Sequence, residues 1–300
     1  MPAVPEATLS TWTGAPSDSE DERHDNARRA IAAAIDASSA FDDATLNVYA
    51  KGSYTNHTNV VRDSDVDVAV EMTSVTYFGF EHGAAGRSME DFGFDRYSGR
   101  YDSDRLKDDV ERTLVARFGS GAVTRGNYAL HVRESSTRLA ADVVPCYAKR
   151  LYYSAAGEYH QGIVIRPDQG TWHDNFPAQH LEAGRAKNTA TLRRYKSVVR
   201  IVKRLENKMV SERVIAVVPS FLIESLVWNT ADGVFIFHDS WTERLQGVLV
   251  HAWEGLESAA NQEQWVEANG VQLLFGSHQK WTRAQARQFA YDAWSYLEYP

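Results

Sequence analysis

Two aspartates, Asp65 and Asp67, lie two positions apart in the run DVDVAV. Because successive side chains of a strand point to opposite faces, both carboxylates would project from one face and the valines from the other. Such close carboxylates raise each other's pKa unless a cation lies between them, and Mg²⁺ binds through oxygen ligands of this kind. A lone D-x-D pair is more often part of a surface strand or turn, so other residues must decide between the two interpretations.

Asp142 is the third acidic residue of this pattern. It interrupts the otherwise apolar run 139–144, which is typical of a buried strand. A carboxylate on a neighbouring strand of the same sheet would complete a site for two divalent metal ions. We therefore predict that Asp65, Asp67 and Asp142 are both the metal ligands and the catalytic residues.

The pair Gly52–Ser53 follows the apolar run 46–50 and precedes the two aspartates. Glycine lets the backbone approach a ligand closely. The Ser53 hydroxyl and the neighbouring N–H groups are suited to hold a triphosphate. A Gly–Ser pair alone is common. In the order strand, Gly–Ser, D-x-D strand and isolated strand aspartate, it predicts a metal site beside a turn that can hold a triphosphate.

The elements that must position these residues form a sheet-containing N-terminal half. Apolar spacing predicts one helix from Ser17 or Asp18 through Ile35, and another over 104–118 that stops at Gly119. Strands are predicted at 46–50, 66–70, 129–132 and 139–144, with a hairpin over 150–165. The Gly-rich and aromatic residues 73–102 have no clear period and receive no assignment.

Helical patterns dominate the C-terminal half. A long helix is predicted from about residue 190 to 209, with Leu192 on its apolar side. Further helices are predicted to begin near Pro219, Asp239 and Thr282. The fold class is therefore α+β. The predicted domains are an irregular N-terminal arm (1–17), a catalytic lobe (18–170) and a helical C-terminal lobe (171–300).

The chain has 300 residues, a formal net charge of −8 and one cysteine. An acidic molecule does not attract long nucleic acid non-specifically, and no stretch of the sequence is apolar enough to cross a bilayer. We therefore expect a cytoplasmic protein that binds neither long nucleic acid nor a membrane. The basic segment 185–213 indicates a local anion site or, equally well, a solvated helix face.

From Gly52–Ser53 to the aspartates, the chain resembles the DNA polymerase β-like nucleotidyltransferases. More narrowly, it resembles the bacterial relatives of cyclic GMP–AMP synthase, the CD-NTases of antiphage defence, and among them the pyrimidine-accepting clade E. The resemblance covers roughly residues 18–230 and implies a polymerase β-like core sheet followed by a helical C-terminal lobe. Four runs carry it: GSYTNHTNV from 52, SDVDVAV from 64, ADVVPC from 141, and NFP at 175 through KN at 187 into the basic helix.

The resemblance implies roles for individual residues. Asp65, Asp67 and Asp142 would hold two Mg²⁺ ions, or Mn²⁺ in their place, and Ser53 beside Gly52 would bind a phosphate oxygen. Lys203, with Lys196 as the alternative, would contact the triphosphate from the C-terminal helix. Ser220 would bind phosphate and Phe221 would stack on a base. A solvated position for Lys203 and ordinary core packing for Phe221 are equally good interpretations.

Base choice and product are also implied by the resemblance. Uracil preference in this clade is associated with an asparagine beyond the hairpin, for which Asn175 is the candidate and Asn188 the alternative. Asn175 could equally cap a turn. None of the ten histidines has metal-ligand spacing, so none is assigned to zinc.

The expected reaction is synthesis of a cyclic dinucleotide second messenger from two NTPs, UTP and ATP among them, in antiphage defence. The alternative is nucleotidyl transfer to another acceptor, such as an RNA 3′ end, a protein or a small molecule. A non-catalytic binding module is a third interpretation, which the intact carboxylate triad disfavours. The sequence predicts no particular activator, effector protein, oligomeric state or 2′–5′ or 3′–5′ linkage.

Overall fold

The computed structural model describes residues 4–15, 17–60, 65–101, 105–257 and 265–300, apart from the side chain of Asp18. These residues fall into two compact units. The sheet unit comprises Ser17–Thr55 and Ser64–Ala178. The helical unit comprises Met1–Pro16, Asn56–Asp63 and Gln179–Pro300. The segment 56–60, which follows the Gly–Ser pair in sequence, therefore belongs to the helical unit.

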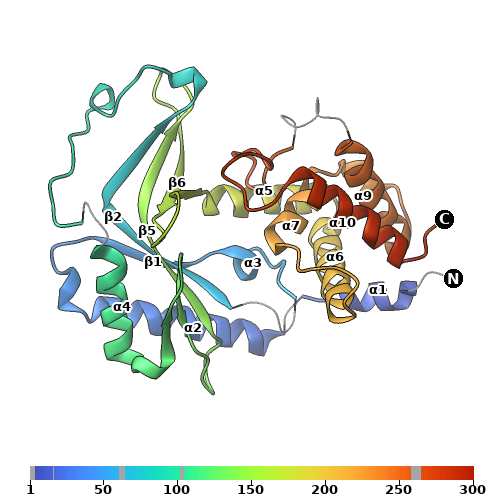
Figure 1. Ribbon diagram of the computed structural model, residues 1–300, viewed down its shortest axis with the longest axis horizontal. Helices are drawn as coiled ribbons and strands as arrows, with labels where there is room; N and C mark the ends of the chain where they lie inside the picture. Colours follow the sequence, from blue (N-terminus) through green and yellow to red (C-terminus); the bar gives the residue numbers. More distant parts are fainter. Residues whose placement is uncertain (1–3, 16, 61–64, 102–104, 258–264) are drawn as a thin grey trace. The chain divides into compact units, whose positions relative to one another are not determined.

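The sheet unit contains the strands and the first long helices (Figure 1). In chain order its main elements are α2 (Asp18–Asp36), β1 (Leu46–Ala50), α3 (Gly52–Thr55), β2 (Val66–Phe80), α4 (Arg105–Phe118), β3 (Val123–Arg125), β4 (Leu130–Val132), β5 (Ala141–Tyr152), β6 (Tyr159–Ile165) and β7 (His173–Asn175). Short 3₁₀ turns lie at Ser39–Phe41, His82–Ala84, Glu90–Phe92 and Ser120–Ala122.

The strands of the described residues form one mixed sheet in the order β1-β2-β5-β4-β3, with β6 beside β5 and β7 beside β6. The central pair, β2 and β5, is parallel, and the other pairs are antiparallel. The long strand β5 changes neighbours along its length: its beginning pairs with β4 and its later part with β6. The start of β5 consequently lies between the start of β2 and the strand β4.

One face of this sheet packs on α2 and α4. Val66, Val68 and Val70 of β2 are fully buried in that core. This alternation confirms the predicted strand and leaves the aspartates to the opposite face. The predicted cap at the start of α2 is also present, since the Glu20 carboxylate accepts a hydrogen bond from the backbone N–H of Ser17 at 3.0 Å.

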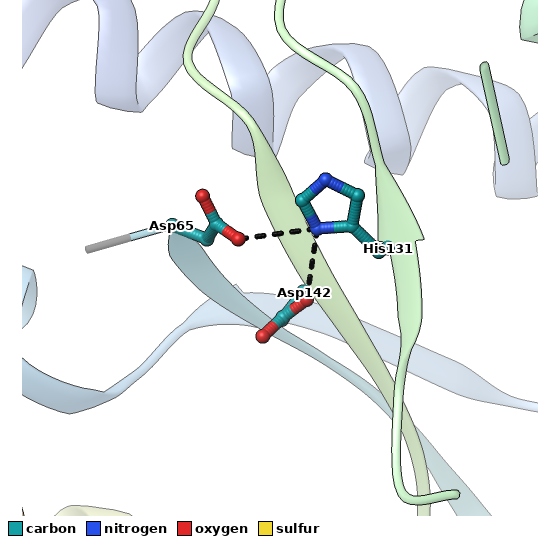
Figure 2. Close-up of side chains that lie close together, drawn as sticks. All are labelled: Asp65, His131 and Asp142. Atoms are coloured by element: carbon teal, nitrogen blue, oxygen red, sulfur yellow. Dashed lines mark hydrogen bonds and ion pairs between the residues drawn. The ribbon is translucent and has the colours of Figure 1, made fainter. Parts of the chain in front are cut away.

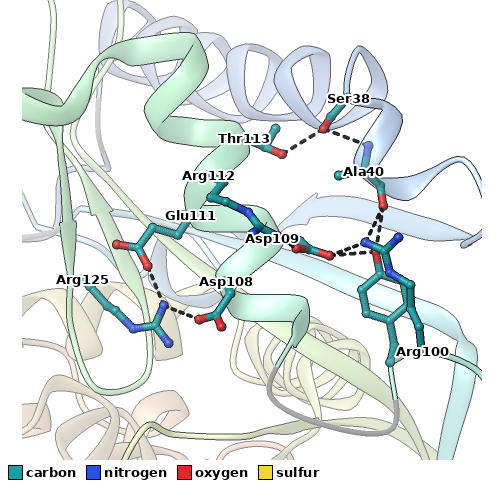
Figure 3. A network of polar contacts seen from close by, with 10 residues as sticks. Ser38, Ala40, Arg100, Asp108, Asp109, Glu111, Arg112, Thr113 and Arg125 are labelled. Carbon is teal, nitrogen blue, oxygen red and sulfur yellow. Dashed lines mark hydrogen bonds and ion pairs between the residues drawn. The ribbon is translucent and has the colours of Figure 1, made fainter.

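Asp109, which is buried in α4, is the centre of a polar network (Figure 3). Its carboxylate accepts hydrogen bonds from Arg100 at 2.6 Å, from Arg112, and from Tyr101 at 3.2 Å. Arg100 and Tyr101 also donate to the carbonyl of Ala40. Because a buried carboxylate is costly unless it is paired, these bonds tie α4 to the chain after α2.

The helical unit is built around a core formed chiefly by α1, α6, α7, α9 and α10. Its elements are α1 (Glu6–Trp12), most of α5 (Pro177–Ala190), α6 (Arg194–Ser211), α7 (Ser220–Asn229), α8 (Asp232–Ile236), α9 (Trp241–Gly255) and α10 (Arg283–Tyr296). The predicted helices near Pro219, Asp239 and Thr282 are confirmed as α7, α9 and α10. No helix in the described ranges is long and apolar enough to span a bilayer.

We predicted an irregular N-terminal arm, but this segment contains the helix α1. Leu9 of α1 is fully buried in the helical core. The Glu6 carboxylate accepts hydrogen bonds from the backbone N–H groups of Trp241 and Thr242, at 2.7 and 2.8 Å. A seven-residue helix is marginal in isolation, so these tertiary contacts stabilise it.

The helix predicted from about residue 190 to 209 is confirmed as α6, but its predicted start is wrong, because the chain turns between α5 and α6. Leu192 and Arg193 have positive φ angles of 53° and 65°, and such values interrupt a helix. Leu192, predicted on the apolar side, is 62% exposed. The Thr191 hydroxyl stabilises the turn by donating to the carbonyl of Lys187 and accepting from the N–H of Tyr195.

The other predicted helices and strands are present, but two strands, β2 and β5, are much longer than predicted. Strand β2 continues to Phe80, into the segment that received no assignment. The predicted hairpin is formed by β5 and β6, with Gly157 at a φ of 97° in its turn. Residue 104, the predicted start of α4, lies outside the described residues. The predicted domain boundaries at 17 and 170 stay predictions.

Candidate active site

Three polar residues form a row across three neighbouring strands. Asp67 on β2 is the register partner of Asp142 on the parallel strand β5. Asp142 is in turn the register partner of His131 on the antiparallel strand β4. Register partners project from the same face of a sheet, so these residues, which are far apart in the sequence, lie on one face.

Asp65, which directly precedes β2, joins two members of this row (Figure 2). His131 Nδ1 lies 3.1 Å from Asp65 Oδ2 and 3.3 Å from Asp142 Oδ1. One potential ligand atom from each of the three residues lies within 4.8 Å of the others. The three side chains are 41–43% exposed, so solvent and ligands can reach the cluster.

The electrostatics of the cluster favour a cation. Burial raises the pKa of Asp65, and the neighbouring Asp142 raises it further, while His131 partly offsets both effects. Two carboxylates that destabilise each other's charge gain most from a positive ion between them. The donor set of two carboxylates and an imidazole, half-exposed to solvent, therefore fits a divalent cation that keeps water or phosphate ligands.

Gly52 lies beside the carboxylate of Asp67. Gly52 has a φ of 75°, and a Cβ at this position would overlap Asp67 Oδ2. Only glycine combines this backbone conformation with the space that the carboxylate needs. The backbone N–H of Lys51 also donates to the carbonyl of Asp67 at 2.9 Å. The Gly–Ser turn, with half-buried Ser53 in α3, is thereby held against β2.

The structure thus brings Asp65 and Asp142 together with His131, and places Asp67 beside both Asp142 and Gly52. Asp67 is not among the three residues whose ligand atoms gather within 4.8 Å. Its role as a metal ligand, and the number of metal ions, stay predictions. His131 was missing from the predicted site. The signal for it was a polar residue between the buried Leu130 and Val132, in a strand that precedes the one carrying Asp142.

Asn175, the predicted base-contacting residue, is half-buried at the end of β7, where it pairs with Ile163 of β6. Phe176 beside it is buried, and a Cβ at Gly162 would overlap the Phe176 ring. The alternative, Asn188, accepts a hydrogen bond from the backbone N–H of Lys196 at 3.2 Å. Asn188 therefore has a structural role at the start of α6.

In the helical unit, the two candidate lysines on α6 have different surroundings. Lys203 is 3% exposed, and its Nζ forms an ion pair with Glu224 Oε2 at 3.0 Å. Lys196 is 8% exposed and has no carboxylate oxygen within 4.0 Å among the described residues. Burial lowers the pKa of Lys196, an effect that Glu224 partly offsets. Among the described residues, Lys203 thus has a carboxylate partner and Lys196 has none, and the phosphate contacts of both lysines stay predictions.

Ser220 and Phe221 begin α7, as predicted. Ser220 is exposed, and Phe221 is half-buried. The Phe221 ring makes edge contacts with His180 at 5.1 Å and Trp281 at 6.4 Å between centroids. Both residues keep surface available to a ligand, and their nucleotide contacts stay predictions.

Comparisons with known proteins agree with this geometry. A model of the cGAS/DncV-like nucleotidyltransferase C-terminal helical domain matches residues 182–298. The cyclic dipyrimidine nucleotide synthase CdnE of Cecembia lonarensis is 35% identical, with both chains covered in full. This likeness extends over the whole chain, so it includes both the sheet unit and the helical unit.

Two solved structures share the fold. The CdnE cyclic dinucleotide synthase of Elizabethkingia meningoseptica, solved with GTP and Apcpp, has 31% identity and a TM-score of 0.80, covering 98% of this chain and 99% of that one. The CdnE c-UMP-AMP synthase of Rhodothermus marinus, solved with Apcpp and Upnpp, has 28% identity and a TM-score of 0.79, covering 97% and 95%. The chain therefore belongs to the CD-NTase family of nucleotidyltransferases, among the CdnE cyclic dinucleotide synthases of clade E.

Proposed function

We propose that this protein joins two nucleoside triphosphates into a cyclic dinucleotide second messenger of antiphage defence, with UTP and ATP among its substrates. The observation that carries the proposal is the row of Asp67, Asp142 and His131 with Asp65 beside it. Relatives of the same length that are named cyclic dinucleotide synthases support the product class.

The proposed chemistry has two similar steps. In each, a ribose hydroxyl attacks the α-phosphorus of a triphosphate, an oxygen–phosphorus bond forms, and the bond to pyrophosphate breaks. The second step closes the ring, so two triphosphates yield one cyclic dinucleotide and two pyrophosphates. Because the nucleotides bring both nucleophile and leaving group, the protein contributes mainly positioning and charge.

We assign Asp65, Asp67 and Asp142 to the binding of two Mg²⁺ ions, or Mn²⁺ in their place. When bound, the metal neutralises triphosphate charge and lowers the pKa of the attacking hydroxyl. We assign acceptance of the hydroxyl proton to the carboxylate of Asp142, at the centre of the row. His131 Nδ1 bridges Asp65 and Asp142 and keeps the two carboxylates together.

Phosphate binding is assigned to Ser53 on the Gly–Ser turn and to Lys196 and Ser220 in the helical unit, with Phe221 stacking on a base. Lys196 is preferred to Lys203 because its buried ammonium has no carboxylate partner among the described side chains. The names of the relatives support the pyrimidine assignment: one is a cyclic dipyrimidine nucleotide synthase and another a c-UMP-AMP synthase. We assign uracil recognition to Asn175.

The roles of the two lobes and the cellular compartment are proposed from this reaction. We propose that 18–170 is the catalytic lobe and 171–300 a helical C-terminal lobe, and that the protein works in the cytoplasm, where NTPs are made. Incubation with all pairs of the four NTPs and Mg²⁺, followed by mass spectrometry and nuclease mapping, tests the function. Phosphatase-resistant dinucleotides containing uracil are expected. Only linear or tail-extended products would instead favour transfer to another acceptor.

A further inference from the structure

A buried polar network lies inside the helical unit, around Glu224 of α7. Glu224 is 2% exposed and forms hydrogen bonds or ion pairs with three of the described residues. Its Oε2 accepts a hydrogen bond from Thr58 Oγ1 at 2.7 Å and lies 3.0 Å from Lys203 Nζ. Its Oε1 lies 2.8 Å from His180 Nε2. The network therefore joins α5, α6 and α7 to Thr58, a residue that lies in no helix or strand.

Burial of these charges is not required for a stable helical core. The desolvation of a buried ion pair is costly, and apolar residues of similar volume often serve stability as well. Burial raises the pKa of Glu224, but Lys203, His180 and the Thr58 hydrogen bond outweigh this effect and hold that pKa well below its ordinary value. The carboxylate is thus ionised, and it holds Thr58 through a charge-assisted hydrogen bond.

Thr58 belongs to a segment with further buried anchors, which we call loop 56–60. Asn56 Nδ2 lies 3.1 Å from His180 Nδ1, and the carbonyl of His57 accepts a hydrogen bond from Arg200 Nη1 at 2.6 Å. His57 has a φ of 52°, an uncommon conformation for a residue other than glycine. Loop 56–60 is consequently fixed in one conformation by side chains of α5, α6 and α7.

The network can affect the proposed active site because of where loop 56–60 lies in the chain. Loop 56–60 follows the Gly52–Ser53 turn by two residues, and the chain after it leads to Asp65. Only Tyr54 and Thr55 separate the loop from the turn that is proposed to hold phosphate, so a shift of the loop strains that turn.

We propose that Glu224 is a positioning residue for nucleotidyl transfer, which holds loop 56–60 through Thr58 and so fixes the Gly–Ser turn before it. This proposal rests on the proposed function and adds a residue that touches neither substrate nor metal. Lys203 and His180 keep the Glu224 carboxylate charged and oriented. The lysine predicted from sequence to bind phosphate thus acts through the loop.

The test replaces Thr58 rather than Glu224, because removal of the carboxylate would leave Lys203 charged and unpaired in the core. Thr58→Val keeps the volume and removes only the hydroxyl, and Glu224 retains its two other partners. Thr58→Ser keeps the hydroxyl and serves as the rescue. Ser225→Ala is the matched control: Ser225 is fully buried on the same helix, and its hydroxyl accepts from the N–H of Ala268, outside the loop.

Two readouts are measured for each variant well below its unfolding temperature. The first is kcat and KM for dinucleotide synthesis, and the second is hydrogen exchange of the loop amides. Thr58→Val is expected to lower kcat about tenfold or more with a smaller change in KM, since small misplacements of reacting groups have large effects on rate. The same variant is expected to speed exchange in loop 56–60. Thr58→Ser and Ser225→Ala are expected to keep the wild-type kcat and loop exchange.

Each result decides the proposal. An unchanged kcat or unchanged loop exchange in Thr58→Val overturns it, as does an equal loss of kcat in Ser225→Ala, which would indicate a purely structural effect. If the wild type makes no product from any NTP pair, the proposed function fails and the positioning role falls with it. Failure of the positioning role alone is recognised by normal synthesis in both the wild type and Thr58→Val.

Discussion

Asp67 and Asp142 are register partners on the parallel strands β2 and β5, although 75 positions separate them in the chain. Parallel pairing places their side chains on one face at the same level of the sheet. His131 continues the row on β4. The carboxylates are therefore positioned by the most central strands of the sheet unit, whose opposite face is buried against α2 and α4.

Gly52→Ala is expected to abolish most synthesis, because its Cβ would overlap Asp67 Oδ2. The positive φ adds about 1–2 kcal/mol of backbone strain for a residue with a Cβ. Gly86→Ala is the matched control, since Gly86 has a φ of 80° and a Cβ there would meet no atom within 4 Å. Both variants share the backbone strain, which urea titrations measure, and only Gly52→Ala should lose activity. Full activity in Gly52→Ala would refute the steric explanation.

Lys196→Met and Lys203→Met are expected to have opposite consequences. Lys196→Met should raise KM for the NTPs with little loss of stability, because the lysine has no carboxylate partner among the described residues. Lys203→Met leaves Glu224 buried without its ion pair, and such a loss destabilises a protein by about 3–5 kcal/mol. Steady-state kinetics and urea unfolding separate the two effects. A stable Lys203→Met protein with a raised KM would restore Lys203 as the phosphate contact.

Asn175→Ala is expected to change the ratio of UTP to ATP incorporation, since loss of the amide removes both a donor and an acceptor for a base edge. Asn188→Ala is the comparison, because Asn188 accepts a hydrogen bond at the start of α6. It should lower stability and leave base choice unchanged. Competition assays with equal UTP and ATP measure the ratio. A shift in Asn188→Ala alone would reassign the base contact.

Glu224 should make the helical unit less stable in acid. Its folded pKa lies below the unfolded value, so its contribution is complete above the unfolded pKa and is lost as the pH falls further. The groups in contact with it are Lys203, His180 and Thr58, and Lys196 also interacts with it electrostatically. Below about pH 4.3, the wild type should lose about 1.4 kcal/mol more per pH unit than a Glu224→Gln/Lys203→Met double variant, which lacks both charges. Parallel losses in urea titrations would contradict the ionised state of Glu224.

The sequence was most informative where local pattern decides position. The alternating valines of β2 predict which face carries Asp65 and Asp67, and the strand before Gly52 predicts a turn there. His131 could not be assigned in the same way, because its meaning depends on the register between β4 and β5. A polar residue in a short strand does not show which residue of the neighbouring strand will lie opposite it.

The helical unit was harder to predict for the same reason. Lys203 is paired with Glu224, the single charged residue of α7, and only folding brings them together. The seven-residue helix α1 is stabilised by its contacts with α6 and α9. Because these contacts cannot be read from its own residues, the composition of the segment suggested an irregular arm. Leu192 fits a continuous apolar stripe, and the turn that exposes it was not predicted from its own residues.

The most direct measurement of the central claim compares the wild type with Asp142→Asn, incubated with all four NTPs and Mg²⁺ and analysed by mass spectrometry. The wild type should form a phosphatase-resistant dinucleotide and release pyrophosphate. Asp142→Asn should be slower by about 10³-fold or more, because a bound metal supplies several kcal/mol of transition-state stabilisation. Asp108→Asn, which changes an exposed carboxylate on α4, should match the wild type. Synthesis by Asp142→Asn at the wild-type rate would contradict a carboxylate-held metal centre on this face of the sheet.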